Sequence, residues 1–335
     1  MQIKIDKIND TASPKQRSFT NSPQNYIFTS GSSSSKSCQI SIYLKPLSSK
    51  CIAMSQRLAK DILIIGGGYI GLELHRQLVQ TGFEADLIKR TPVPVTRGQV
   101  LLKDISKPFV LDKKYHIVFY LISPDHSSEA AYQKAYVNGV EESLAALSPR
   151  SEDARFLFCS STAVYSENQG RLINEESGIS QSHFRQKFLL GGEQLIRDSH
   201  FESVILRLSG IYGPGRDRLF QAAKNGLLTR KSGTFISNRI HRYDCAASMI
   251  HLAFQENPAP IYNISDSLPT DYNQVINWLA KKTNHKTPVP VDPDLNPGRL
   301  SNKKICNQRL LNSGYRFKFP DYRSGFLNLM ERDSV

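Results

Sequence analysis

A short aliphatic run that leads into three spaced glycines constrains the fold of this chain more than any other feature. Residues 62–65 read Ile-Leu-Ile-Ile, and the pattern Gly66-x-Gly68-x-x-Gly71 follows directly. A buried strand that turns into a helix in this way presents helix-terminal N–H groups that can hold a phosphate. The run therefore predicts a strand, a tight turn and a helix that bind the pyrophosphate of a nucleotide cofactor. A purely structural strand–helix turn is the alternative.

Each glycine has a separate steric role in this prediction. Gly66 permits the tight turn, Gly68 lets the backbone approach the pyrophosphate, and Gly71 lets the helix pack close to the sheet. Tyr69 and Ile70 stand where the predicted helix starts, so we expect them to contact the cofactor as well.

The composition narrows the classes of partner. The chain has 335 residues and a formal net charge of +13. Its mean hydropathy is −0.37, and no apolar stretch approaches the ~18 residues that span a membrane. Lys and Arg do not cluster with interleaved aromatic residues, so a small anionic substrate or cofactor is expected rather than nucleic acid. These features are typical of a cytoplasmic globular protein.

The cysteine pattern predicts no metal centre. The five cysteines are scattered, form no C-x-x-C pair and have no histidine nearby at ligand spacing. We therefore expect neither a disulfide framework nor a zinc site, and a reducing compartment fits. These residues are Cys38, Cys51, Cys159, Cys245 and Cys306.

Residues 1–53 differ in composition from the rest of the chain. They are rich in Ser, carry seven Lys or Arg against two Asp, and lack periodic apolar positions. Such a segment cannot bury enough apolar surface to offset its ordering entropy. Three interpretations are open: an organellar transit peptide, a disordered tail, or upstream sequence before a translation start at Met54.

Short apolar strands alternate with amphipathic helices after this segment. Strand patterns cover residues 62–65, 85–89, 116–122, 155–159 and 204–208, and helix patterns cover 70–80, 127–147 and 184–197. This alternation predicts an α/β fold with a doubly wound parallel sheet of the Rossmann type. We expect the Rossmann domain over residues 58–209. Residues 210–330 are richer in Pro and Gly and are expected to form a small substrate lobe, partly interleaved with the sheet.

Several further segments, in their order along the chain, resemble those of a known superfamily. They are residues 159–165 (CSSTAVY), 206–216 (LRLSGIYGPGR), 239–246 (RIHRYDCA), 261–266 (IYNISD) and 313–323 (SGYRFKFPDYR). Together with the glycine pattern they resemble an atypical branch of the extended short-chain dehydrogenase/reductases. That superfamily includes the NAD-dependent epimerase/dehydratase enzymes, and the branch includes the bacterial YeeZ-type proteins. The resemblance covers roughly residues 58–330. It implies an NAD(P)-dependent oxidoreductase or an epimerase/dehydratase-like enzyme that acts on a small anionic or sugar-like substrate.

The same resemblance implies catalytic residues, with one departure. In the superfamily a Ser or Thr orients the substrate oxygen, a Tyr acts as acid and base, and a Lys four residues later binds the nicotinamide ribose. Ser161 and Lys187 match the first and last of these positions, but His183 stands four residues before Lys187 where Tyr is usual. His183 could donate the proton, because imidazole titrates near neutral pH. It could equally be a polar residue at a helix start, or the protein could bind the cofactor without hydride chemistry, as a regulator.

The end of the second predicted strand favours NADP(H) over NAD, although NAD is possible. An acidic residue at that point holds the ribose 2′-hydroxyl of NAD, whereas a basic residue accommodates a 2′-phosphate. Lys89 and Arg90 stand at the strand tip, and Asp86 lies earlier, inside the strand. A solvated basic turn is the alternative.

Two further residues are candidate cofactor contacts. Asp104 occupies a place where the relatives contact adenine, although a helix-capping role is equally open. Ser123 follows the next strong strand and is expected beside the cofactor cleft.

Four cationic or titratable residues are candidates for the substrate side. Arg216 follows a Gly-Pro-Gly turn, and Arg239, His241 and Arg242 lie together further on. Arg presents a planar fork suited to phosphate or carboxylate. The alternative for Arg242 is a structural pair with Asp244 at a helix start.

Overall fold

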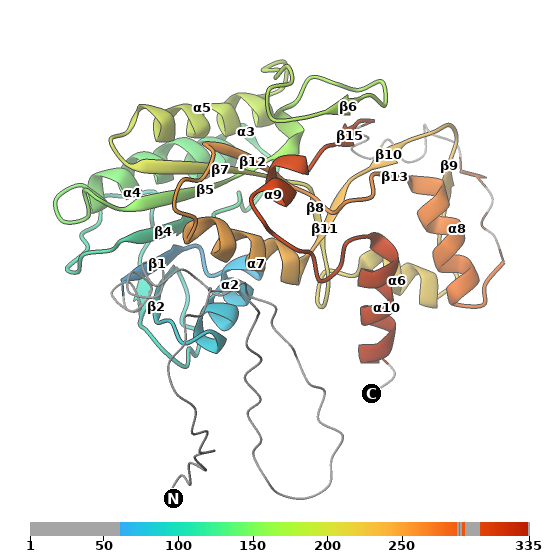
Figure 1. The fold of residues 1–335 in the computed structure, drawn as a ribbon, viewed down its shortest axis with the longest axis horizontal. Helices are drawn as coiled ribbons and strands as arrows, with labels where there is room; N and C mark the ends of the chain where they lie inside the picture. The colour runs from blue at the N-terminus through green and yellow to red at the C-terminus, as the bar shows by residue number, and fades with distance from the viewer. Residues whose placement is uncertain (1–60, 287, 289, 292–301, 334–335) are drawn as a thin grey trace, which may run out of the picture. The chain divides into compact units, whose positions relative to one another are not determined.

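The central sheet has the arrangement expected of a doubly wound fold. The computed structural model describes residues 61–286, 288, 290–291 and 302–333, so the predictions for residues 1–53 and Met54 lie outside the described residues. Seven parallel strands lie in the order β12-β7-β5-β4-β1-β2-β3 (Figure 1). They are β1 (Ile62–Ile65), β2 (Ala85–Lys89), β3 (Val100–Leu102), β4 (Ile117–Tyr120), β5 (Arg155–Ser161), β7 (Glu202–Leu208) and β12 (Ile261–Ile264). The predicted fold class is confirmed.

The order of the strands reverses at β1. This strand pairs with β2 on one side and with β4 on the other. In open parallel sheets, ligands bind outside the carboxyl ends of the strands at such a reversal point. The loops that follow β1, β2 and β4 therefore surround the expected ligand crevice.

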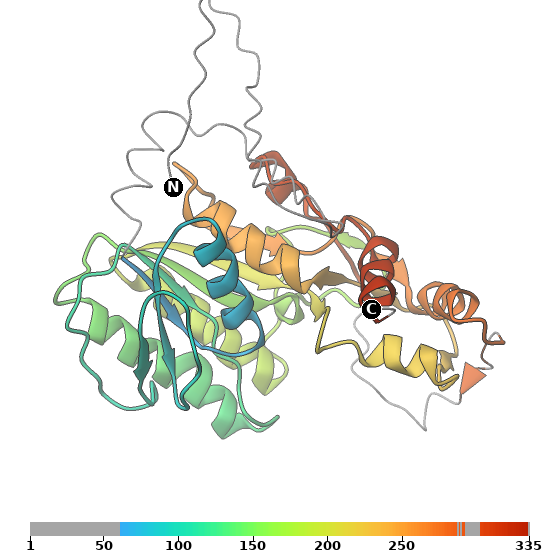
Figure 2. The same cartoon turned by 90° about the horizontal axis from the view of Figure 1, so that it is seen from below.

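Helices cover both faces of the sheet because its strands are apolar on both sides. Ile62 and Ile64 pack with α2 (Tyr69–Gln80) and α7 (Arg242–Ala253), whereas Leu63 and Ile65 pack with helices on the opposite face. All four β1 side chains are fully buried. Figure 2 shows α2 and α7 on one side of the sheet and α4 (Gly139–Leu147) and α5 (Phe184–Asp198) on the other.

The helix predicted over residues 127–147 is interrupted. The structure divides it into α3 (Glu129–Gln133), the π-helical segment η1 (Lys134–Asn138) and α4. The hydroxyl of Tyr120 on β4 donates a hydrogen bond to the carbonyl of Ala135 at 2.5 Å. In a regular α-helix that carbonyl would accept from the N–H of Gly139 instead, so the inserted hydroxyl accounts for the wider turn.

Residues beyond Leu208 contribute a third hydrophobic cluster with its own small elements. Tyr212, Phe220, Leu279 and Phe326 belong to that cluster.

The remaining elements of the described residues are η2 (Thr162–Val164), β6 (Leu172–Ile173), β8 (Gly210–Tyr212), α6 (Arg218–Lys224), β9 (Arg230–Lys231), β10 (Ile236–Ser237), β11 (Arg239–His241), β13 (Thr270–Asp271), α8 (Tyr272–Lys282), β14 (Pro290–Val291), β15 (Lys304–Ile305), α9 (Gln308–Asn312) and α10 (Tyr322–Asp333). The boundary predicted at residue 210 stays a prediction.

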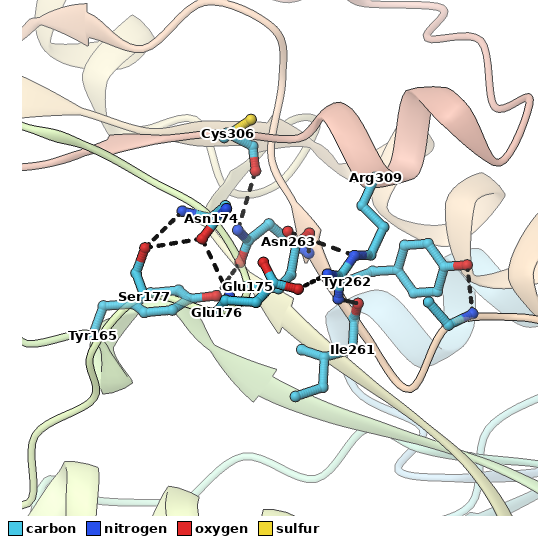
Figure 3. A network of polar contacts seen from close by, with 11 residues as sticks. Tyr165, Asn174, Glu175, Glu176, Ser177, Ile261, Tyr262, Asn263, Cys306 and Arg309 are labelled. Carbon is cyan, nitrogen blue, oxygen red and sulfur yellow. Dashed lines mark hydrogen bonds and ion pairs between the residues drawn. The ribbon is translucent and has the colours of Figure 1, made fainter.

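Side chains cap the outer edge of β12, the last strand of the sheet (Figure 3). The carboxylate of Glu175 accepts from the N–H of Asn263 at 2.8 Å, and the Arg309 guanidinium donates to the carbonyl of Ile261 at 3.0 Å. The Asn263 side chain also donates to the carbonyl of Cys306 at 3.1 Å. These bonds take the place of a neighbouring strand, which protects an edge that would otherwise offer free N–H and C=O groups.

Candidate cofactor and active site

The glycine turn is fixed by backbone contacts that leave no room for side chains at two positions. Gly66 has a φ of +116°, and a Cβ there would lie 3.0 Å from the carbonyl carbon and oxygen of Leu121. A Cβ at Gly71 would lie 2.0 Å from the carbonyl oxygen of Gly66. The N–H groups of Gly66 and Gly67 both donate to the carbonyl of Ile88, at 3.1 and 3.2 Å. These bonds hold the turn against the end of β2.

Gly68 faces open space instead. No protein atom of the described residues lies within 4 Å of a Cβ built there. Gly68 is the N-cap of α2, and the helix has neither a side-chain cap nor an acidic residue in its first turn, which Tyr69 and Ile70 begin. The N-terminal N–H groups of a helix attract anions. This uncapped turn therefore fits the pyrophosphate of a dinucleotide.

The tip of β2 carries the predicted basic pair. Lys89 is partly exposed, and a Cβ at Gly67 would lie 3.0 Å from its Cδ atom. Arg90 forms two hydrogen bonds to Asp125, at 2.6 and 2.7 Å. Asp86 is buried inside β2 and accepts from the hydroxyl of Tyr115 at 2.9 Å. The strand tip is therefore basic, as the sequence indicated.

Asp104 and Ser123 lie in the loops around the same edge. The Asp104 carboxylate accepts from the N–H and the hydroxyl of Ser106, at 3.2 and 2.7 Å, and lies 3.6 Å from the ammonium of Lys134. It caps a turn rather than a helix. Ser123 is exposed, in the loop that leads from β4 to Asp125.

The candidate catalytic side chains are held by local contacts. Ser161 ends β5 and accepts from the N–H of Ala163 at 3.2 Å. His183 is the N-cap of α5, and its Nδ1 accepts from the N–H of Arg185 at 3.2 Å. Lys187 is exposed and lines a cavity of about 370 Å³ together with Gln194, Arg197 and others. These contacts do not bring Lys187 to Ser161, and the catalytic roles stay predictions.

A different face of α5 points toward the sheet. Arg185 donates to the hydroxyl of Ser127, in the loop after β4, at 2.5 Å. One and two turns later, Leu189 and Glu193 are buried. Residues two apart on a helix point about 200° away from each other, so Lys187 is turned away from this face. Sequence reasoning missed Arg185, because the face of α5 that points toward the sheet depends on contacts with other elements.

A buried ion pair fixes α5 on the sheet. Arg207 on β7 donates to the Glu193 carboxylate from Nε at 3.0 Å and from Nη2 at 2.7 Å. The hydroxyl of Ser160 on β5 donates to the same carboxylate at 2.6 Å. All three residues are buried. Paired charges of this kind set the position of the helix relative to the carboxyl ends of β5 and β7.

Tyr69 joins the glycine turn to two of the predicted substrate residues. The guanidinium of Arg242 lies 4.4 Å from the centre of its ring and that of Arg216 lies 5.5 Å away. Burial raises the pKa of the Tyr69 hydroxyl to about 12, although both cations oppose that rise. Arg242 lies 3.9 Å from Glu73 on α2 rather than beside Asp244. The two arginines therefore lie close to the N-terminus of α2.

Arg239 and His241 belong to a buried polar cluster with Tyr212 and Asp266. Burial lowers the pKa of Arg239, lowers that of His241 to about 4 and raises that of Asp266 to about 7. Four polar atoms of the cluster have no hydrogen-bond partner among the described residues: Tyr212 Oη, Arg239 Nη1, His241 Nε2 and Asp266 Oδ2. Buried polar groups are normally paired with protein, water or ligand. Sequence reasoning did not single out Tyr212 or Asp266, because their meeting depends on long-range packing.

A family model identifies the family of the chain. The model of the NAD dependent epimerase/dehydratase family matches residues 62–265, which is more than half of the chain. The chain belongs to this family. The resemblance noted from the sequence is thereby confirmed.

Individual relatives agree with this assignment. A protein of Methylobacillus flagellatus regarded as an NAD-dependent epimerase/dehydratase is 32% identical, covers 83% of this chain and 100% of its own, and has a TM-score of 0.69. The spore coat polysaccharide biosynthesis protein SpsK of Bacillus subtilis is 26% identical over 216 residues, which are 62% of this chain and 73% of SpsK.

More distant structures share the fold. MoeE5, solved with UDP-glucuronic acid and NAD, is 20% identical, covers 82% of this chain and 100% of its own, and has a TM-score of 0.69. Human SDR39U1, solved with NADPH, is 17% identical, covers 81% and 99%, and has a TM-score of 0.68.

The described residues contain neither a candidate metal centre nor a helix that could span a membrane. No group of three or more His, Cys, Asp or Glu side chains there is placed to hold a metal ion. None of the helices in the same part of the chain is long and apolar enough to cross a membrane.

Proposed function

We propose that this chain is an NADP(H)-dependent reductase or epimerase-like enzyme that acts on a small anionic or sugar-like substrate. The observation that carries the proposal is the glycine turn. Gly66 and Gly71 exclude side chains, Gly68 opens onto free space, and the helix that follows has no cap of its own. A dinucleotide pyrophosphate matches this combination of shape and dipole.

The basic strand tip supports NADP(H) as the preferred cofactor. Lys89 and Arg90 end the strand where an NAD-preferring site carries an acid. Asp86, the acidic side chain in this strand, is engaged by Tyr115 in the interior. Human SDR39U1, solved with NADPH, shares the fold. A dianionic 2′-phosphate would find cationic partners at this tip.

The cations near Tyr69 support an anionic or sugar-phosphate substrate. Arg216 is exposed beside the glycine turn, and Arg242 lies close to it. Arg239 and His241 are buried further in, with atoms that lack protein partners in the described residues. MoeE5, of the same fold, was solved with UDP-glucuronic acid and in another structure with UDP-glucose. A nucleotide sugar carries the phosphates that such arginines bind.

One observation favours a second candidate, a non-catalytic NADP-binding regulator. Arg185 and Leu189 occupy the face of α5 that points toward the sheet, and neither can donate a proton at neutral pH. His183 is occupied as a helix cap, and Lys187 lies on the far face. If Ser161, His183 and Lys187 do act together, the start of α5 has to rearrange when ligands bind.

Two assays on the same purified protein separate these functions. Calorimetry with NADPH measures binding, and absorbance at the nicotinamide band measures turnover over a panel of carbonyl substrates that includes nucleotide-linked keto sugars. The enzyme proposal predicts NADPH binding and turnover of at least one substrate. Binding without turnover over the whole panel would favour the regulator, and no binding of either NADPH or NADH would contradict both.

A further inference from the structure

An ion pair spans the carboxyl end of β1. Arg90 directly follows β2, and Asp125 lies in the loop after β4. Their side chains share two parallel hydrogen bonds, Nη2–Oδ1 at 2.6 Å and Nη1–Oδ2 at 2.7 Å. Because β2 and β4 flank β1, this pair crosses the strand that leads into the glycine turn. It therefore lies at the edge where the adenosine half of a dinucleotide binds.

The two short, parallel hydrogen bonds are well formed, but both side chains are exposed to solvent. The Arg90 and Asp125 side chains are 57% and 47% exposed. Their hydrogen bonds lower the pKa of Asp125 and raise that of Arg90, so both stay charged at neutral pH. An exposed ion pair contributes little to folding and can be exchanged for another partner. A phosphate offers the Arg fork the same two-oxygen geometry as a carboxylate.

Lys89, the residue before Arg90, differs from it in its ion-pair partners. Within the part of the chain that the structure describes, no carboxylate lies within 4.0 Å of its ammonium in an ion pair. Among the described residues, Lys89 thus has no carboxylate partner, whereas Arg90 is already paired with Asp125.

We propose that Asp125 is a specificity residue that limits the preference for NADP(H) by competing with the 2′-phosphate for Arg90. The proposal rests on the proposed cofactor function. In the free protein Asp125 satisfies the guanidinium fork, and a 2′-phosphate has to displace a like-charged carboxylate to reach it. NAD has no group that needs Arg90, so its affinity does not depend on Asp125.

The test uses the full chain and Asp125→Asn, which keeps the size of the side chain and removes its charge. We expect the dissociation constant for NADPH to fall about three- to tenfold while that for NADH changes less than twofold. The same comparison with 2′,5′-ADP and 5′-AMP isolates the adenosine end. In an Arg90→Ala background, the gain from Asp125→Asn should shrink to less than twofold.

Asp153→Asn is the matched control. Asp153 is an exposed carboxylate in an ion pair with Lys114, and it precedes β5 at the amino ends of the strands. The substitution Asp153→Asn changes the net charge by the same amount as Asp125→Asn, but far from the crevice. Equal gains from Asp125→Asn and Asp153→Asn would overturn the proposal in favour of net charge. A loss of affinity for NADPH and NADH alike would overturn it, and would indicate instead that the Arg90–Asp125 pair closes over the bound cofactor. Absence of binding by both dinucleotides to the unaltered chain would instead remove the proposed function itself.

Discussion

The glycine turn and the buried cluster around Asp266 are two parts of one candidate site that arise in opposite ways. At the turn, every restriction comes from residues 62–71 and the strands directly beside them. In the cluster, Tyr212, Arg239, His241 and Asp266 come from β8, β11 and the end of β12, and packing against α10 buries them. The turn is therefore insensitive to distant changes, whereas the cluster depends on contacts across more than a hundred residues.

The largest effect that separates the two regions is expected from pH and Asp266. Its folded-state pKa is raised from 3.8 to about 7 by burial, so the folded protein holds this proton more tightly than the unfolded chain does. Stability is therefore lost as pH rises from about 4 to 7, by up to about 4 kcal/mol if Asp266 titrates alone. Relative to the unaltered protein, Asp266→Asn should gain stability between pH 5 and pH 8, measured by urea unfolding.

His241 gives stability the opposite dependence on pH over a similar pH range. Burial lowers its pKa to about 4, so the stability that it contributes is lost as pH falls below about 6.5. This contribution is common to Asp266→Asn and the unaltered protein, and it cancels in their difference. A difference that stays constant from pH 5 to pH 8 would show that Asp266 is not protonated in the folded protein.

A smaller effect is expected at the strand tip. The double change Lys89→Ala with Arg90→Ala should weaken NADPH at least tenfold, because charge-assisted contacts to the 2′-phosphate are lost, and should leave NADH nearly unaffected. Isothermal titration of both cofactors measures this. Equal losses for both would remove the assignment of Lys89 and Arg90 to the 2′-phosphate.

The smallest effect concerns His183, which belongs to neither region. As the N-cap of α5 it should contribute about 1 kcal/mol to the free energy of unfolding, so His183→Ala loses that amount and His183→Asn restores it. If His183 only caps the helix, turnover should change in parallel with the free energy of unfolding, so that it falls in His183→Ala and recovers in His183→Asn. A drop of about 10²–10⁴-fold in kcat for the well-folded Asn variant would instead identify the imidazole as the proton donor.

The sequence allowed the turn to be predicted because its chemistry is local. A strand, three glycines and a helix are neighbours in the chain, and steric exclusion at Gly66 and Gly71 needs no knowledge of the rest of the fold. The predicted bounds of β1 and β2 match the structure for the same reason. The basic tip at Lys89 and Arg90 was equally accessible, since a strand end is defined by its own residues.

The rest of the site depends on contacts that no local pattern contains. The partner of Arg90 is 35 residues away in the sequence. The face of α5 that points toward the sheet is set by the buried pair of Glu193 and Arg207. Spacing from His183 to Lys187 marked a helix but gave no indication of which face would point toward the sheet. The π-helical segment before α4 likewise depends on the hydroxyl of Tyr120 from another strand.

The most direct test of the central claim, that the glycine turn holds a nicotinamide dinucleotide, is titration of Gly68→Val with NADPH beside the unaltered chain. No described protein atom lies within 4 Å of the new Cβ, and the φ of −87° suits a side chain, so the variant should fold with an unchanged melting temperature. The branched side chain would occupy the space of the pyrophosphate. The account predicts saturable binding to the unaltered chain and none to the folded variant. Equal binding of NADPH to both proteins would contradict it.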